Sequence, residues 1–208
     1  MRDIPINTRT FSVQYPDTRD ASVCAAQPST APWWMFVWNS GIAMAHKIHE
    51  LPPSQSILDI GCGLGLTAIV AQSLGHTAYV TDIASECYEY VKMNAETNGT
   101  AHPVWVNSVD DIPLHSLDCV LMSDVLYNKY SVRQTLIDVI HRIKPDGILM
   151  IAEPPRLREA AIMHSIDIFK QEYTKDTITL DSIVDPSEVK DDYTTTHIYT
   201  FTGPWGSL

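Results

Sequence analysis

The stretch from Ser56 to Asp82 constrains the fold of this chain most, because it has the pattern of strand, glycine-rich turn, helix and second strand. The apolar run over residues 57–60 is typical of a buried parallel strand. Three glycines at alternate positions, Gly61, Gly63 and Gly65, let the main chain turn tightly and leave its N–H groups open to a ligand. Asp82 follows about twenty residues beyond them, where nucleotide-binding units place an acid for ribose hydroxyls. The stretch therefore predicts a cofactor that contains adenosine.

This glycine loop departs in two respects from a loop that binds a dinucleotide. Leu66 stands where the pattern Gly-x-Gly-x-x-Gly has its third glycine. Asp59, two residues before the first glycine, would lie poorly beside a diphosphate, whereas a carboxylate suits a ligand with an ammonium or sulfonium charge. The loop thus favours a positively charged adenosine cofactor over NAD.

The rest of the chain alternates between apolar strands and amphipathic helices. Near the C-terminus, two segments alternate polar and apolar residues on either side of an acidic loop, which predicts an antiparallel pair added to a parallel sheet. After the glycine unit, we expect strands over 103–107, 117–127 and 148–153, helices over 85–98, 131–143 and 157–169, and hairpin strands over 176–180 and 194–201. The pattern predicts an α/β fold of βα units and a final hairpin, preceded by an N-terminal helix.

Residues 1–30 are polar, contain prolines and have no clear periodicity. Phe11, Val13 and Tyr15 alternate, so we expect either a short edge strand or an N-terminal strap that lies over the domain. Residues 31–208 are expected to form a single domain.

A helix is expected to start at Pro32, because proline is favoured in the first helical turn. Three tryptophans, Trp33, Trp34 and Trp38, stand close together at its beginning, more than a surface helix needs. We expect two of them to be core aromatics that clamp the helix to the sheet. Trp38 is the expected exception, lining a cofactor or substrate pocket, because an aromatic face suits adenine or a cationic group.

The composition of the 208 residues excludes several classes of protein. With 45% hydrophobic and 19% charged residues, the chain suits one globular domain with a full core. No apolar run approaches the roughly 20 residues of a membrane span, and the first residues lack a signal-peptide core. A cytoplasmic location is therefore expected. The cysteines are dispersed without a Cys-x-x-Cys pair, so neither a disulfide framework nor a metal site is predicted. They are Cys24, Cys62, Cys87 and Cys119.

The formal net charge of −11 bears on the partner. A chain this acidic repels a phosphate backbone, and its lysines and arginines are dispersed along the sequence, so nucleic acid is not expected as a substrate. A basic protein surface or a cationic small molecule is the better match. The alternative is that the charge serves only solubility.

The glycine unit resembles a known family. The run Leu58-Asp59-Ile60-Gly61-Cys62-Gly63-x-Gly65 is similar to motif I of the class I S-adenosylmethionine-dependent methyltransferases, and Asp82 matches that family's acid for the ribose hydroxyls. The resemblance implies a Rossmann-like, doubly wound sheet of seven strands with a C-terminal antiparallel hairpin. It also implies S-adenosylmethionine as the cofactor.

The same resemblance implies a set of cofactor contacts. The glycine loop would cradle the methionine part with Asp59 close by, and Asp82 would bind the ribose with Ile83 packing on adenine. Asp110 is a weaker candidate for the adenine amino group. The implied cofactor-binding residues are Trp38, Asp59, Gly61, Cys62, Gly63, Gly65, Asp82, Ile83, Ser108, Val109 and Ser123.

A narrower resemblance concerns the methyl acceptor. The run Ser123-Asp124-Val125-Leu126-Tyr127 is similar to the Asp-x-x-Tyr signature of the seven-β-strand protein lysine methyltransferases. The segment 32–45, rich in tryptophan, resembles the corresponding segment of the branch that methylates lysines of the electron-transfer flavoprotein β-subunit. Two departures leave the acceptor open: Glu153-Pro-Pro-Arg stands where that branch has Asp-Pro-Gly-Arg, and Asn39 stands where proline is common.

The resemblance implies catalytic roles for Asp124 and Tyr127. Asp124 would fix the acceptor amine, and Tyr127 would shape the channel that orients its lone pair. The alternative is a strand-end acid that caps the next helix and a core tyrosine. At the level of function, a protein lysine methyltransferase stands beside two alternatives. One is a small-molecule N- or O-methyltransferase, for example of small amines, and the other is a non-catalytic cofactor-binding partner protein.

Overall fold

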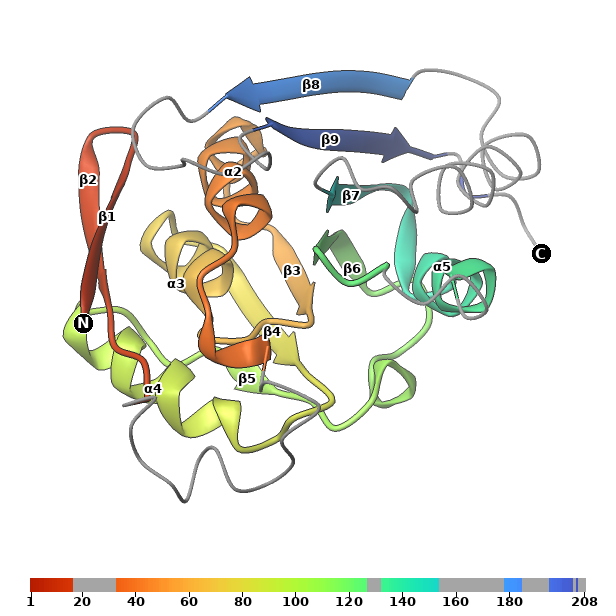
Figure 1. Cartoon of the computed structure of the whole chain (residues 1–208). Coiled ribbons are helices and arrows are strands. Elements are labelled where there is room, and N and C mark those ends of the chain that lie inside the picture. Colours follow the sequence, from red (N-terminus) through yellow and green to blue (C-terminus); the bar gives the residue numbers. More distant parts are fainter. Residues whose placement is uncertain (17–32, 127–131, 154–177, 185–194, 204, 206–208) are drawn as a thin grey trace.

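A seven-stranded sheet forms the centre of the molecule, with the strand order β5-β4-β3-β6-β7-β9-β8 (Figure 1). The computed structural model describes residues 1–16, 33–126, 132–153, 178–184, 195–203 and 205. The strands of the sheet are β3 (Ser56–Ile60), β4 (Thr77–Thr81), β5 (Val104–Trp105), β6 (Leu117–Ser123), β7 (Ile143–Glu153), β8 (Ile178–Val184) and β9 (Thr195–Thr202).

The direction of the strands confirms the predicted Rossmann-like, doubly wound fold. Strands β5, β4, β3, β6 and β7 run parallel to one another. Strand β9 is antiparallel to β7, and β8 pairs antiparallel with β9 at the edge, which is the predicted C-terminal hairpin. The chain leaves β3 toward β5 and returns to the other side of β3 as β6. At such a change of direction, ligands of open α/β sheets bind beyond the carboxyl ends of the strands.

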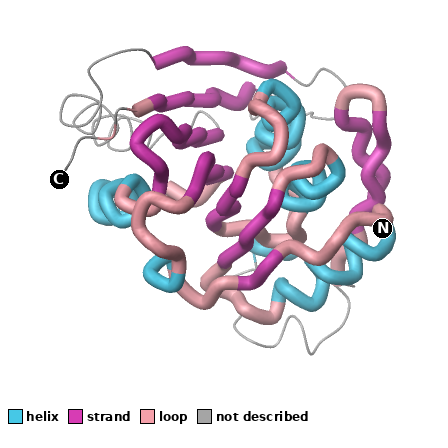
Figure 2. The backbone as a smooth tube through the Cα atoms, turned by 180° about the vertical axis from the view of Figure 1, so that it is seen from behind, coloured by secondary structure: helices cyan, strands magenta, loops and turns pink. Residues whose placement is uncertain are grey.

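Helices cover both faces of the sheet (Figure 2). Alternate residues of β6 separate the two cores: Cys119 and Leu121 pack in the cluster that includes residues of α2 and α3, whereas Val120 and Met122 pack in the cluster that includes residues of α5. Because both faces are covered, the middle of the strand, residues 119–122, is apolar on both sides, as its sequence predicts. The helices are α2 (Asn39–Lys47), α3 (Leu66–Ser73), α4 (Cys87–Thr97) and α5 (Val132–Ile140), with 3-10 turns η1 (Trp33–Met35), η2 (Ile48–Glu50) and η3 (Val109–Asp111).

The N-terminal residues form a β-hairpin, of which only the second strand was considered in the sequence analysis. Strands β1 (Arg2–Ile6) and β2 (Arg9–Val13) pair as a separate two-stranded antiparallel sheet, so β2 is not an edge strand of the main sheet. Ile4, Ile6 and Phe11 are buried in a core that they share with residues of α2, α3 and α4. Pro5 interrupts the alternation of the isoleucines, which is why β1 was not predicted.

Side-chain amides attach this hairpin to α4. Asn98 accepts a hydrogen bond from Ser12 N (3.0 Å) and donates one to Ser12 O (2.8 Å). Asn94 is fully buried and makes the same pair of contacts with Gln14, at 2.6 and 3.1 Å. It also donates to Leu64 O in the glycine loop (3.0 Å). The hairpin is therefore linked through one side chain to the loop where the cofactor was predicted.

Two predicted helices differ from the structure or lie outside it. The helix expected from Pro32 begins instead at Asn39, after the short turn η1. The helix expected over 157–169 lies outside the described residues. Among the described residues, no helix is long and apolar enough to cross a membrane.

Candidate active site

The glycine loop connects β3 to α3 and is shaped by main-chain contacts. All three glycines have positive φ, the region that residues with a side chain rarely adopt. A Cβ on Gly61 would lie 2.3 Å from Val125 Cγ1, and a Cβ on Gly63 would lie 3.0 Å from Trp34 O. The absence of side chains here therefore lets two distant segments pack directly against the loop. One of them is the segment that carries Asp124.

Asp59 lies at the end of β3, directly before the loop, and is only 2% exposed. Burial, together with the negative charge of Asp82, raises the pKa of Asp59 to about 8. Its Oδ2 atom has no hydrogen-bond partner among the described residues. A buried carboxyl group with an unoccupied oxygen is costly unless a cation or donor binds it. This observation fits the ammonium group of the implied cofactor.

Asp82 follows β4 on the opposite side of the loop. Gly63 N donates to Asp82 Oδ2 (2.9 Å), and Ala84 N donates to Asp82 Oδ1 (3.0 Å). These bonds fix the carboxylate while each oxygen retains a lone pair for a ribose hydroxyl. The next residue, Ile83, is 94% exposed, so its apolar surface is open to an adenine ring. The pair fits the predicted nucleoside contacts.

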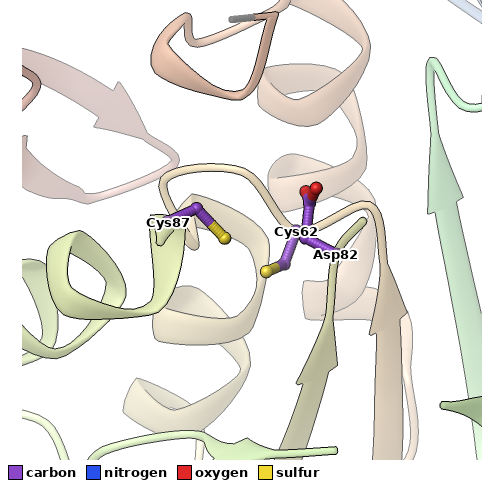
Figure 3. A group of neighbouring side chains, drawn as sticks. All are labelled: Cys62, Asp82 and Cys87. Atoms are coloured by element: carbon purple, nitrogen blue, oxygen red, sulfur yellow. The ribbon is translucent and has the colours of Figure 1, made fainter. Parts of the chain in front are cut away.

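Cys62, Asp82 and Cys87 form a cluster whose two sulfur atoms and one carboxylate oxygen lie within 4.8 Å of one another (Figure 3). This cluster was not predicted, because its two cysteines come from different elements and have no metal-site spacing along the chain. Contact with Cys87, burial and the charges of nearby carboxylates raise the pKa of the Cys62 thiol well above its ordinary value. Both sulfur atoms are buried, that of Cys62 within the loop and that of Cys87 at the start of α4.

The turn η3 lies between β5 and β6 and contains the residues predicted to meet the adenine edge. Ser108 Oγ accepts from Asp110 N (3.1 Å), and Asp111 accepts from Ser108 N (3.1 Å), so the two side chains form a capping box. Asp110 pairs with Arg142 at 2.6 Å. This ion pair gives Asp110 a structural partner other than adenine, whereas contacts of Ser108 and Val109 with the cofactor remain predictions.

The tryptophans of the η1 segment are more exposed than predicted. Trp33 is 58% exposed and Trp38 is 37% exposed. Trp34 alone is packed inward, against Tyr90 (ring centroids 5.6 Å apart). The expectation that two of the three are core residues is therefore wrong, because an aromatic cluster in the sequence does not reveal which face is covered. Trp38 lies beside Phe36 and Trp33 in an exposed aromatic group, and its Nε1 donates to Trp33 O.

Asp124 stands directly after β6 in a strained main-chain conformation. Its φ of 57° lies in the left-handed region, where aspartate is one of the few tolerated residues. Asp124 N donates to Ala152 O of β7 (2.9 Å), and the residue is half-buried. The preceding Ser123 is also half-buried, and its hydroxyl has no hydrogen-bond partner among the described residues. Tyr127, the other predicted catalytic residue, lies outside the described residues.

Glu153 is a further residue of this region whose role the sequence did not reveal. It is the last residue of β7 and only 6% exposed. Its Oε1 atom accepts hydrogen bonds from Val125 N (3.1 Å) and Leu126 N (3.0 Å). The one signal in the sequence was the departure Glu-Pro-Pro-Arg from the expected Asp-Pro-Gly-Arg.

The structure brings most of the predicted residues to one edge of the sheet. Asp59, the glycines and Asp82 lie at the carboxyl ends of β3 and β4, and Asp124 follows β6, the neighbour of β3. The contact between Val125 and Gly61 joins the two parts. The residue predicted to meet the methyl acceptor is thus connected directly to the loop predicted to hold the cofactor.

Solved structures that share this fold include methyltransferases. A precorrin-6y C5,15-methyltransferase from Geobacter metallireducens aligns with 91% of this chain and 100% of that chain, with a TM-score of 0.61 and 14% identity. A ribosomal protein L11 methylase from Lactobacillus delbrueckii aligns with 81% of both chains, with a TM-score of 0.60 and 16% identity. These likenesses show the fold; together with the match to a lysine methyltransferase family model, they define the class of S-adenosylmethionine-dependent methyltransferases and confirm the predicted cofactor.

The chain belongs to the lysine methyltransferase family, whose model matches residues 31–168. The ubiquinone biosynthesis O-methyltransferase of Rickettsia canadensis is 28% identical over 148 residues, which cover 68% of this chain and 61% of the relative. The electron transfer flavoprotein beta subunit lysine methyltransferase of Danio rerio is 29% identical over 120 residues, which cover 55% of this chain and 45% of the relative. The chain thus spans about half to three fifths of the length of these relatives.

Proposed function

We propose that this protein transfers the methyl group of S-adenosylmethionine to an amine, and that the amine is a lysine side chain of a protein. The observation that carries the proposal is the left-handed turn at Asp124, which follows β6 and packs on the glycine loop through Val125. The family match supports a lysine acceptor, as does the similarity to a lysine methyltransferase of the electron transfer flavoprotein.

The cofactor would be held by the residues around the glycine loop. Asp59 would bind the ammonium group and lose its proton as it does so, because a nearby cation lowers the pKa of a carboxyl group. Asp82 would bind the ribose hydroxyls, and the exposed side chain of Ile83 would cover adenine. When bound, S-adenosylmethionine supplies a methyl group that is activated by a sulfonium charge.

The active site must bind the acceptor amine in its neutral form and orient it. A free lysine has a pKa near 10.4, so only about one amine in a thousand is neutral near pH 7.4. Partial burial beside the aromatic group of Trp33, Phe36 and Trp38 would lower this pKa, because burial disfavours the charged form. Asp124 would accept a hydrogen bond from the neutral amine and so hold its lone pair in line with the methyl group. Holding the reacting atoms in line is worth several orders of magnitude in rate.

The acidic character of the chain supports a basic acceptor. A net charge of −11 attracts a lysine-rich protein surface and repels a phosphate backbone. We therefore propose a basic protein surface as the partner and do not propose nucleic acid. A cytoplasmic location, and an N-terminal strap over residues 1–30, remain predictions.

A small-molecule acceptor is the second candidate. It is favoured by the similarity to the ubiquinone biosynthesis O-methyltransferase of Rickettsia canadensis, which covers 68% of this chain. An oxygen acceptor would use the same turn at Asp124, with the carboxylate removing a proton from a hydroxyl group.

The test compares wild type with Asp124→Asn in a cell extract that contains labelled S-adenosylmethionine. Asparagine tolerates the left-handed conformation, so the turn should keep its shape while the carboxylate is lost. We expect label in the protein fraction with wild type, a decrease of about 100-fold or more with Asp124→Asn, and similar cofactor affinity for both. Asp118→Asn, at the opposite end of β6, is the matched control and should keep its activity. Label confined to small molecules would favour the second candidate, and full activity of Asp124→Asn would refute the role of Asp124.

A further inference from the structure

The turn after β6 is held at three consecutive residues. Asp124 N donates to Ala152 O (2.9 Å), which extends the pairing of β6 and β7 by one residue. Val125 packs its side chain on Gly61, and Leu126 is buried in the core. The N–H groups of Val125 and Leu126 have their acceptor outside the turn. Both point to a single atom, Glu153 Oε1.

A carboxylate is well suited to this position. Two N–H groups in a row form a concave donor site like that at the start of a helix, and a charged acceptor makes such bonds stronger than a neutral one. Glu153 is itself fixed, because it is paired with His197 of β9 in the sheet register and lies in a buried position. The residue before a proline is also restricted to extended main chain, and residue 154 is proline.

The conformation of Asp124 depends on this arrangement. A residue other than glycine seldom adopts a φ near 57° and persists there only where its surroundings hold it. Without Glu153 Oε1, the N–H groups of Val125 and Leu126 lose the one acceptor that they share, and the main chain can relax toward the common regions. The Asp124 carboxylate would then move away from the position set by the contact of Val125 with Gly61.

We propose that Glu153 is a positioning residue of the acceptor site: through Val125 N and Leu126 N it holds the turn that sets where the Asp124 carboxylate lies. The proposal rests on the proposed function in one respect, that Asp124 contacts the methyl acceptor. Glu153 acts through the main chain of the turn and contacts neither the acceptor nor the cofactor. The turn requires an acceptor oxygen at this point; the negative charge strengthens the two hydrogen bonds but is not needed to form them.

The first experiment measures the turn directly and needs no methyl acceptor. Amide hydrogen exchange of Val125 and Leu126 is compared in wild type, Glu153→Gln and Glu153→Ala. We expect exchange to accelerate by about 10-fold or more in Glu153→Ala, because both hydrogen bonds are lost. Glu153→Gln keeps an oxygen at Oε1 and should retain most of the protection. Unchanged exchange in a folded Glu153→Ala protein would overturn the proposal whatever the enzyme methylates.

The second experiment measures catalysis with the same variants and the acceptor fraction labelled by wild type. Glu153→Ala should lower kcat by about 10- to 100-fold, since misplacing a catalytic group by about 1 Å costs this much. Its dissociation constant for S-adenosylmethionine should stay within about threefold of wild type, and Glu153→Gln should recover most of the rate. Asp118→Asn is the matched control, because Asp118 also accepts a main-chain N–H, from Ser56, but at the far end of β6.

The possible results separate the two proposals. A Glu153→Gln protein with normal exchange but without activity would show that the charge acts directly, and the positioning role would be wrong. If Glu153→Ala weakens S-adenosylmethionine binding as much as it lowers kcat, the positioning role is also contradicted, because the substitution would then have disturbed the glycine loop. If wild type labels only small molecules, the proposal for the lysine acceptor fails, while the hydrogen-exchange result still decides the role of Glu153.

Discussion

Replacing Asp59 with asparagine should change how the free energy of unfolding depends on pH, and the structure gives the direction and the size of this change. Asp59 is 2% exposed, and burial, then the charge of Asp82, raises its pKa from 3.8 to about 8. Because the folded protein holds this proton more tightly than the unfolded chain, the free energy of unfolding falls as the pH rises from the ordinary value toward 8. Asparagine has nearly the same shape and no charge, so the Asp59→Asn protein avoids this loss.

The size of the effect is set by the pH interval. One pKa unit corresponds to about 1.4 kcal/mol, so the three units from pH 5 to pH 8 reduce the contribution of Asp59 by about 4 kcal/mol. Relative to wild type, the ligand-free Asp59→Asn protein should therefore become more stable by about this amount over the same interval. The same variant should bind S-adenosylmethionine more weakly, because the ammonium group loses its carboxylate partner.

Urea unfolding of both proteins without cofactor, at pH 5 and at pH 8, measures the first effect, and calorimetric titration with S-adenosylmethionine measures the second. Asp118→Asn is the control. Although burial raises the pKa of Asp118, hydrogen bonds from Lys144 and Ser56 hold it below its ordinary value. Asp118 is therefore ionised throughout this interval, and its replacement should destabilise the protein equally at both pH values. A stability difference between Asp59→Asn and wild type that is the same at both pH values would refute the assignment of a buried, protonated Asp59.

Two further substitutions test the packing around the site. Gly61→Ala places a methyl group against Val125 at a positive φ, so it should lower the free energy of unfolding by about 1–3 kcal/mol and decrease methyl transfer. The double variant with Val125→Ala removes the opposing methyl groups, so urea unfolding should show that part of the stability is recovered. If none is recovered, the contact between Val125 and Gly61 is contradicted. Asn94→Ala removes the hydrogen bonds to Gln14 and Leu64 from a fully buried position. It should therefore lower the free energy of unfolding by about 2–4 kcal/mol and make the N-terminal hairpin easier to cleave in limited proteolysis. Unchanged cleavage would show that apolar contacts alone hold the hairpin.

The cofactor half of the site was predictable because its information is local. The glycines, Asp59 and Asp82 lie within one strand–loop–helix–strand unit, where residue type and spacing determine the main-chain geometry. The same holds for the C-terminal hairpin, whose alternating residues predict strands regardless of what covers them. In such segments, neighbouring residues determine the local structure, so it can be predicted without knowing which distant residues pack on it.

The acceptor half was predictable only in part, because distant contacts determine it. Asp124 was predicted from the resemblance of residues 123–127 to the Asp-x-x-Tyr signature. The main chain that follows it is held by Glu153, which is 28 residues from Val125 along the chain. The exposure of Trp33 likewise depends on whether another segment of the chain packs on it. A cluster of aromatic residues in the sequence does not show this. Strand β1 was missed because Pro5 breaks the pattern on the outer side of a hairpin whose inner side is buried.

The central claim is that the turn after β6 presents a lysine amine to the cofactor. The most direct test is to isolate a protein that the enzyme labels in a cell extract, hydrolyse it and identify the labelled amino acid. We expect label on methyl-lysine that is present with wild type and with Asp118→Asn and is lost with Asp124→Asn. Label on any other amino acid, or label on methyl-lysine that persists with Asp124→Asn, would contradict it.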